Sequence, residues 1–202
     1  MYAPSHFKID DLDSIEEFVK KNSFATIISS TDSYPFASHT PLLIRKKDGE
    51  YVLCGHLARA NKHTKEFETD TKVLVIFQGT HGYISSYAKD PEEMSILPTW
   101  NYQLVHARGE LNVLSDDELK SFMHSLTDTL EKDQPKSMDL KNYPEKELKE
   151  YLKRIIRFEI KVTEWFACFR MNQNRSSEIR AHIKNHNKNN PELVKAIDEA
   201  NP

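Results

Sequence analysis

The stretch "LCGHLARANKHTKEF", residues 53–67, joins an apolar, strand-like run to the first turn of a short amphipathic helix. The connection carries a dense set of hydrogen-bonding side chains: His56, Arg59, Asn61, Lys62 and His63. A turn from a strand into a helix presents backbone N–H groups and the positive end of the helix dipole, which together favour an anion. Arg59 and Lys62 can close on the same anion, and a guanidinium suits a bidentate phosphate contact. A solvated helix face is the alternative, and the spacing leaves both interpretations open.

Short runs of strand-forming residues surround this stretch. Between residues 24 and 114 they read "FATIISST", "FASHTPLLIRK", "EYVLCGHL", "KVLVIFQG", "HGYISSYA" and "QLVHARGELNVL". Asp48-Gly49, between the second run and the third, is a dipeptide typical of tight antiparallel hairpins. We therefore expect a mainly β fold, a six-strand barrel or sandwich interrupted by one short helix near residues 60–68.

Helices are expected at both ends of the chain and in one insertion. The signals for helix starts are Asp13 with Glu16, Ser115 with Glu118, Ser176 or Ser177, and Asn190 with Pro191. The run "RFEIKVTEWFACFRM" between the last two helical regions and the insertion reads as a further strand pair. We expect residues 1–170 to form one β domain with inserted helices at about 116–152, and residues 171–202 to form a C-terminal helical segment packed on the same domain.

Composition limits the class of protein. The 202 residues are 38% hydrophobic and 29% charged, and no apolar run approaches the roughly 20 residues of a membrane span. The first residues lack the basic start and apolar stretch of a secretory signal, so we expect a cytoplasmic protein with no membrane contact. Cys54 and Cys168 lie in apolar runs without metal-ligand spacing, which predicts core packing and no metal. The net charge of -3 requires any DNA contact to come from a local basic patch.

Common catalytic motifs are missing from the sequence. It contains no Gly-x-Gly-x-x-Gly, Walker loop, His-Glu-x-x-His or Gly-x-Ser-x-Gly pattern, so dinucleotide, nucleoside-triphosphate, zinc-protease and hydrolase functions lose their main support. Serine, histidine and aspartate are plentiful, but no spacing selects a triad. Catalytic residues are therefore not assigned.

Three further polar or aromatic runs are candidates for ligand contact. "ASHTPLL" puts Ser38 and Thr40 on one face of a strand and His39 on the other, which suits either a ligand lying over the strand or a wet edge strand. "ILPTWNY" contains Trp100, a flat group that can floor a planar ligand or simply close a barrel end. The amides of "RMNQNR", residues 170–175, can bond the edge of a heterocycle or cap the following helix.

Taken together, these stretches resemble one family. "MYAPSHF", "FATIISS", "ASHTPLL", "GHLARANKH", "VLVIFQGTHGYIS", "PTWNYQLVHARGEL" and "MNQNR" occur in this order and spacing in PaiB-type proteins, the FMN-binding negative transcriptional regulators of bacteria. The resemblance covers nearly the whole chain. It implies an FMN-binding split β-barrel, similar to pyridoxamine-phosphate oxidases, that forms a homodimer with FMN at the subunit interface.

The resemblance also implies a set of site residues. The "SHT" strand and the "HLARANK" turn correspond to the flavin-phosphate region, and the "PTWNY" and "MNQNR" motifs would lie near the flavin ring or the dimer seam. The cofactor-binding candidates are Ser38, His39, Thr40, His56, Arg59, Asn61, Lys62, Trp100, Asn101, Gln173 and Asn174.

Two departures from the family pattern concern the same site. Thr80 stands where relatives usually have proline, and no tryptophan precedes Trp100, so the rim formed by residues 80–98 is expected to be remodelled. Cys168 and Arg170 occupy positions where relatives often carry lysine, which keeps one positive charge and removes the other.

Three functions follow from the resemblance. The first is a flavin-binding homodimeric repressor, although the only basic cluster, within residues 170–188, is diluted by Glu178 and the sequence shows no helix-turn-helix signature. The second is an FMN-dependent oxidoreductase of the split-barrel class, for which His39, His81 and His106 are the titratable candidates beside the flavin. The third is a dimeric split-barrel protein that has lost its flavin.

Overall fold

The computed structural model describes residues 2–30, 34–67, 71–89, 96–115 and 118–201. Contacts divide the chain into two compact units. Unit 1 comprises Met1–Asn22, Ile76–His106 and Trp165–Pro202, and unit 2 comprises Ser23–Val75 and Ala107–Glu164. Each unit is therefore built from segments far apart in the sequence. The domain boundary expected at residue 170 stays a prediction.

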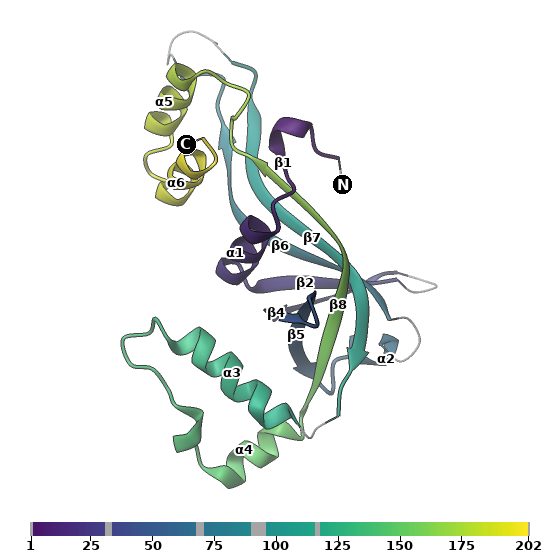
Figure 1. The fold of residues 1–202 in the computed structure, drawn as a ribbon. Helices are drawn as coiled ribbons and strands as arrows, with labels where there is room; N and C mark the ends of the chain where they lie inside the picture. The colour runs from purple at the N-terminus through teal and green to yellow at the C-terminus, as the bar shows by residue number, and fades with distance from the viewer. Residues whose placement is uncertain (1, 31–33, 68–70, 90–95, 116–117, 202) are drawn as a thin grey trace. The chain divides into compact units, whose positions relative to one another are not determined.

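The strands of the described residues form one sheet (Figure 1). Its strands are β1 (Lys8–Ile9), β2 (Phe24–Ser29), β3 (Phe36–Pro41), β4 (Leu43–Lys47), β5 (Glu50–Ala58), β6 (Lys72–Ile84), β7 (Thr99–Val113) and β8 (Ile155–Arg170). The order is β3-β2-β6-β7-β8-β5-β4, and β1 pairs with β8. The pairs β1–β8, β2–β3, β4–β5 and β5–β8 are antiparallel. The mainly β prediction is confirmed.

The strand boundaries differ from the prediction at three places. The run 36–46 is two strands, because the chain changes partner at Leu42: β3 ends on β2 with Pro41 opposite Phe24, and β4 begins on β5 with Leu43 opposite Cys54. Proline lacks the N–H that would continue a ladder. Conversely, the two strands expected within residues 72–88 form the single strand β6, and the strand pair expected near the end is the single strand β8.

Helices α3 (Leu119–Glu131) and α4 (Glu145–Leu152) of unit 2, with the 3-10 turn η3 (Leu140–Asn142), pack on β4, β5 and the start of β8. The short helix α2 (His63–Glu66) instead contacts β3. Phe122 and Leu126 of α3 share a buried apolar cluster with Val52 and Cys54 of β5. Burying side chains of this size contributes about 1.5–3 kcal/mol each. Glu118 is the N-cap residue of α3 and makes no side-chain cap bond, and the expected Ser115–Glu118 capping box spans residues 116–117, which lie outside the described residues.

Helices of unit 1 carry clear capping signals. Asp11, rather than the expected Asp13, caps α1 (Leu12–Lys21) by accepting the Ser14 N–H at 2.8 Å. Ser176 caps α5 (Ser177–His186) and Asn190 caps α6 (Pro191–Glu199), as predicted. Figure 1 shows α5 and α6 as a neighbouring pair, and both contribute to an apolar cluster with Ile84 and Met171. None of the helices in the described ranges is long and apolar enough to cross a membrane.

Candidate functional site

A hydrogen bond joins the two stretches that were expected to bind the flavin phosphate. Asn61, in the turn after β5, donates from Nδ2 to Ser38 Oγ on β3 at 3.1 Å. Ser38 is only 6% exposed, and the Asn61 Oδ1 atom also accepts the backbone N–H of His63 at 3.0 Å. Strand β3 and the turn are thus held together through side chains 23 positions apart in the sequence.

His63 is the centre of this network. Its Nδ1 lies 2.8 Å from Ser38 Oγ, and its Nε2 lies 2.8 Å from Ser29 Oγ on β2. The ring is fully buried, and it lies against Phe36 and Phe67 with centroid distances of 5.5 and 4.7 Å. Burial lowers the pKa of His63 because the charged form loses its hydration. A neutral ring, with one nitrogen donating and the other accepting, satisfies both hydroxyl groups in either tautomer.

His63 was not among the predicted cofactor contacts, and one sequence signal could have identified its structural role. Asn61 precedes it by two residues, and an asparagine side chain often bonds the backbone N–H two residues on. That spacing indicates a turn that fixes the orientation of His63, whereas the type of residue alone suggested a surface donor.

The predicted alternation along β3 is confirmed. Ser38 and Thr40 are buried, and the Thr40 hydroxyl donates to the backbone carbonyl of His56 at 2.8 Å. His39 is exposed on the other face, with its Nδ1 atom 2.9 Å from the Thr26 hydroxyl. The buried polar groups of this edge strand are therefore satisfied within unit 2, which neither requires nor excludes a ligand.

Arg59 has backbone partners in this structure. Its Nε donates to the carbonyl of Lys153 at 3.2 Å and its Nη2 to that of Ile155 at 3.0 Å, while its backbone N–H donates to Arg154 at 2.7 Å. The guanidinium thus ties the turn after β5 to the residues that begin β8. Lys62 is exposed and, in the part of the chain that the structure describes, makes no ion pair. A phosphate contact by Arg59 stays a prediction.

His56 lies on the face of β5 that α3 covers. Its ring contacts Phe122 edge-on, with centroids 6.2 Å apart, and its buried Nδ1 atom has no hydrogen-bond partner among the described residues. Burial lowers the pKa of this histidine as well. The structure places its side chain among the contacts of α3, and a flavin contact by His56 stays a prediction.

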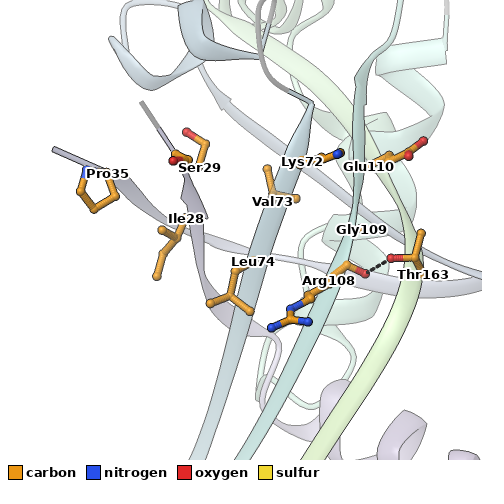
Figure 2. A pocket seen from close by; sticks show the side chains of 11 residues that line it. Ile28, Ser29, Pro35, Lys72, Val73, Leu74, Arg108, Gly109, Glu110 and Thr163 are labelled. Atoms are coloured by element: carbon orange, nitrogen blue, oxygen red, sulfur yellow. Dashed lines mark hydrogen bonds between the residues drawn. The ribbon is translucent and has the colours of Figure 1, made fainter. Parts of the chain in front are cut away.

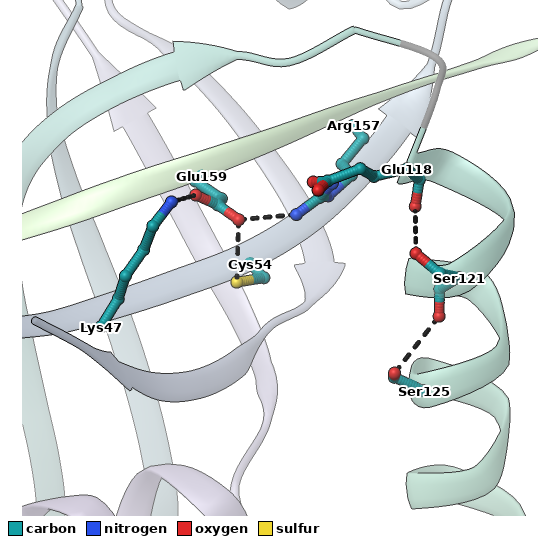
Figure 3. Close-up of polar contacts among 7 residues, drawn as sticks. All are labelled: Lys47, Cys54, Glu118, Ser121, Ser125, Arg157 and Glu159. Atoms are coloured by element: carbon teal, nitrogen blue, oxygen red, sulfur yellow. Dashed lines mark hydrogen bonds and ion pairs between the residues drawn. The ribbon is translucent and has the colours of Figure 1, made fainter.

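An ionic cluster centred on the buried Arg157 occupies the same face (Figure 3). Arg157, with 6% of its side chain exposed, lies 2.7 Å from a carboxylate oxygen of Glu118 and 2.6 Å from one of Glu159. Lys47 approaches Glu159 at 3.6 Å, and the Cys54 thiol donates to Glu159 at 3.8 Å. Burial and the adjacent Glu159 raise the pKa of Cys54 to about 11. This thiol therefore stays protonated at neutral pH, and the cluster links Glu118, the N-cap residue of α3, to the sheet.

A cavity of about 490 Å³ lies beside the His63 network in unit 2 (Figure 2). Its apolar wall includes Ile28 and Leu74, and its charged residues include Lys72 and Arg108. Ser29 lines the cavity and also bonds His63, so the network runs from the cavity wall to the turn that holds Asn61. Arg108 pairs with Glu164 at 2.8 Å, and its carbonyl accepts the Thr163 hydroxyl at 3.2 Å.

The remaining candidates belong to unit 1. Trp100 is 50% exposed, stacks on His81 with centroids 6.0 Å apart, and donates from Nε1 to His81 Nδ1 at 3.3 Å. Asn101 is fully buried, and neither polar atom of its amide has a hydrogen-bond partner within the described ranges. These two neighbours therefore point to opposite faces of β7.

The "MNQNR" amides serve mainly to close the end of β8. Gln173 donates to the carbonyl of Phe169 at 2.5 Å and accepts the N–H of Met171 at 2.8 Å, whereas Asn174 is exposed. Arg170, the positive charge that is kept relative to the family pattern, donates to the Thr99 hydroxyl at 2.8 Å. Flavin contacts by Gln173 and Asn174 stay predictions.

Comparisons with known proteins identify the family. The family model described as "Putative FMN-binding domain" matches residues 1–164. The chain is 38% identical over 176 residues to "Protease synthase and sporulation protein PAI 2" of Bacillus subtilis, covering 87% of this chain and 84% of that protein. It is 31% identical over 169 residues to an uncharacterized protein of Saccharomyces cerevisiae, covering 72% of this chain and 99% of that protein.

Solved structures support the fold. The flavocytochrome Anf3 from Azotobacter vinelandii has a TM-score of 0.59 at 14% identity, covering 89% of this chain and 78% of that chain. The FAD and heme binding protein from Mycobacterium smegmatis has a TM-score of 0.58 at 13% identity, covering 86% of this chain and 78% of that one. At this identity the likeness concerns the fold, which is the split β-barrel of flavin-binding proteins. The chain belongs to the PaiB-type family of FMN-binding proteins, as its motifs indicated.

Proposed function

We propose that this protein is a PaiB-type regulator that holds FMN in unit 2, with the phosphate at the turn formed by residues 59–62. The Asn61–Ser38 hydrogen bond carries the proposal, because it joins the two motifs that the family resemblance assigns to the phosphate region. The buried His63 beneath them fixes the turn on β2 as well as on β3. A turn held in this way loses little conformational entropy when a ligand binds, so little of the binding free energy is spent on ordering it.

The residues at the turn fit a phosphate group. Lys62 supplies an exposed ammonium, and the Arg59 guanidinium lies on the same turn, so the local charge is positive. Charge-assisted hydrogen bonds to phosphate are about twice as strong as neutral ones. When bound, FMN supplies an isoalloxazine ring that accepts electrons or hydride, while the protein supplies binding and orientation.

Unit 1 supplies features that suit a homodimer. Trp100 and Tyr83 are half exposed, and their rings lie 6.0 Å apart. Aromatic side chains are enriched at protein interfaces, so this pair supports the proposed dimer seam. Direct DNA contact has weaker support, because Lys184 is paired with Asp198 and Arg180 donates to the carbonyl of Arg175.

Among the residues that the structure describes, no observation favours an oxidoreductase. The three histidines considered as titratable groups beside the flavin all have partners: His39 with Thr26, His81 with Trp100, and His106 with another group. His39 and His81 are thus hydrogen-bonded strand residues, and His106 lies in strand β7.

Flavin titration tests the proposal, with FMN fluorescence as the signal. Lys62→Ala should weaken FMN binding about tenfold, the effect expected for one hydrogen bond to a charged group. Lys65→Ala is the matched control, because Lys65 is also exposed and lies in the adjacent helix α2. Riboflavin, which lacks the phosphate, should bind the wild type and Lys62→Ala equally. Absence of saturable FMN binding to the wild type, or equal effects of the two lysine substitutions, would overturn the proposal.

A further inference from the structure

Unit 1 contains a second cavity that shares no lining residue with the one in unit 2. Its volume is about 720 Å³, within the range of small-molecule sites. Side chains of α1 and α6 line it together with residues of β6, β7 and β8. The turn of residues 59–62 and strand β3, where the phosphate is proposed to bind, contribute no residue to it. Gln173 and Thr80, which line it, belong to stretches that the family resemblance assigns to the flavin ring or rim, so competition with FMN tests whether the two sites are separate.

Two aromatic side chains line this cavity. Phe18 of α1 and Phe169 of β8 lie with their ring centroids 4.8 Å apart and an interplanar angle of 39°. Gly79 on β6 makes this arrangement possible, since a Cβ at that position would lie 2.7 Å from the Phe18 ring and 3.0 Å from the Gln103 side-chain oxygen. Aromatic floors of this kind favour flat ligands through stacking and edge contacts.

Two polar groups face the same cavity and have no other role in the described structure. The Gln103 amide on β7 and the Thr80 hydroxyl on β6 line the cavity, and neither makes a hydrogen bond or ion pair within the described residues. Gln173, by contrast, also lines it but has both polar atoms bonded to backbone. Gln103 can donate and accept at once, as the edge of a heterocycle requires.

Charged side chains at the rim of the cavity determine which ligand charge it favours. It carries Glu17 and Lys21 of α1 and Glu192, Lys195 and Glu199 of α6. Lys195 and Glu199 form an ion pair at 3.6 Å, which leaves two carboxylates and one ammonium group. This excess of negative charge disfavours an anion and favours a neutral or cationic molecule.

We propose that this cavity binds a small planar heteroaromatic molecule, neutral or cationic, which lies against Phe18 and Phe169 and bonds Gln103 through its ring edge. The ligand class differs from FMN, whose phosphate carries negative charge. The site is therefore a second ligand site of this protein.

Saturation-transfer NMR on the full chain tests the proposal with three probes of similar size: adenine (neutral), benzamidine (cationic) and benzoate (anionic). Adenine and benzamidine should bind saturably and displace each other, and benzoate should bind at least about tenfold more weakly. Excess FMN should displace neither. Absence of saturable adenine binding, equal benzoate binding, or displacement of adenine by FMN would each overturn the proposal.

Substitutions at Gln103 supply a second readout. Gln103→Leu should weaken adenine binding about tenfold, because the ring edge loses its partner. Gln103→Glu should increase the preference for benzamidine over adenine, since it adds a carboxylate beside the ligand. Gln134→Leu, at an exposed glutamine in unit 2, is the matched control and should change neither affinity. Equal adenine affinity in Gln103→Leu and the wild type would contradict the assignment.

Discussion

The hydrogen bonds of His63 predict that Ser29→Ala lowers the free energy of unfolding in the wild type but raises it when residue 63 is phenylalanine. His63→Phe keeps a flat ring between Phe36 and Phe67 but removes the two contacts at 2.8 Å to Ser38 and Ser29. Ser38 retains Asn61 as a partner, whereas the Ser29 hydroxyl, only 1% exposed, loses its contact with the ring nitrogen of residue 63. A lost hydrogen bond costs about 0.5–1.5 kcal/mol, and a stranded buried hydroxyl about 1–3 kcal/mol. We expect His63→Phe to lower the free energy of unfolding by about 2–4 kcal/mol.

Ser29→Ala then separates the network from simple packing. In the wild-type background it strands one nitrogen of His63 and should cost about 1–2 kcal/mol. In the His63→Phe background it removes a hydroxyl that has already lost its partner, so it should restore about 1 kcal/mol. Urea unfolding of the four proteins, followed by circular dichroism at pH 7.5, measures the double-mutant cycle. An equal cost of Ser29→Ala in both backgrounds would refute the network as described.

The same histidine makes stability depend on pH. Burial lowers the pKa of His63 from its ordinary value of 6.5, so below that pH the unfolded chain binds a proton that the folded chain does not. Stability should be flat above about pH 6.5 and fall below it, by at most about 1.4 kcal/mol per pH unit for one such group. His56 acts in the same direction. Unfolding titrations from pH 7.5 to 5.0 should show a smaller loss for His63→Phe than for the wild type, and identical slopes would contradict this role.

Three further predictions concern other contacts. Arg157→Met should lower the free energy of unfolding by about 3 kcal/mol, because Glu159 keeps a mostly buried charge without its partner. Arg108→Met, which removes one partner of an exposed ion pair, is the control and should change it by less than about 1 kcal/mol in the same urea assay. Gly79→Ala should cost about 1–3 kcal/mol in thermal unfolding, since its Cβ would meet the Phe18 ring at 2.7 Å. Arg59→Ala should weaken FMN binding by about 1.5–3 kcal/mol in the fluorescence titration, and an unchanged affinity would remove Arg59 from the phosphate site.

Much of the fold could be predicted because its signals are local. The Asp48-Gly49 hairpin has positive φ at both residues, and Ser176 and Asn190 cap their helices as expected. The strand boundaries were harder. Leu42 belongs to an unbroken apolar run, and what ends β3 there is a change of pairing partner from β2 to β5. Such a change depends on contacts between distant segments, which periodicity does not report.

The candidate site likewise has local features that the sequence predicts and tertiary features that it does not. The sequence predicted correctly that Ser38 and Thr40 share a face opposite His39, because a strand alternates with a period of two. It did not predict that His63 would be fully buried between two serines, because Ser29 and Ser38 lie 34 and 25 positions away. A polar side chain in a turn is usually exposed, and only its tertiary partners show otherwise.

Arg59 shows why residue type alone could not settle the phosphate site. A guanidinium has five N–H donors and accepts nothing, so it bonds whichever oxygen atoms lie within reach. Here the carbonyls of Lys153 and Ile155 take two of those donors, and a phosphate is a stronger acceptor of the same kind. Arg59→Lys separates the two roles, because lysine keeps the charge for a phosphate but cannot reproduce the planar fork that spans two carbonyls. We expect this variant to lose stability in urea unfolding while retaining most of its FMN affinity, and the reverse result would show that the fork serves the flavin rather than the fold.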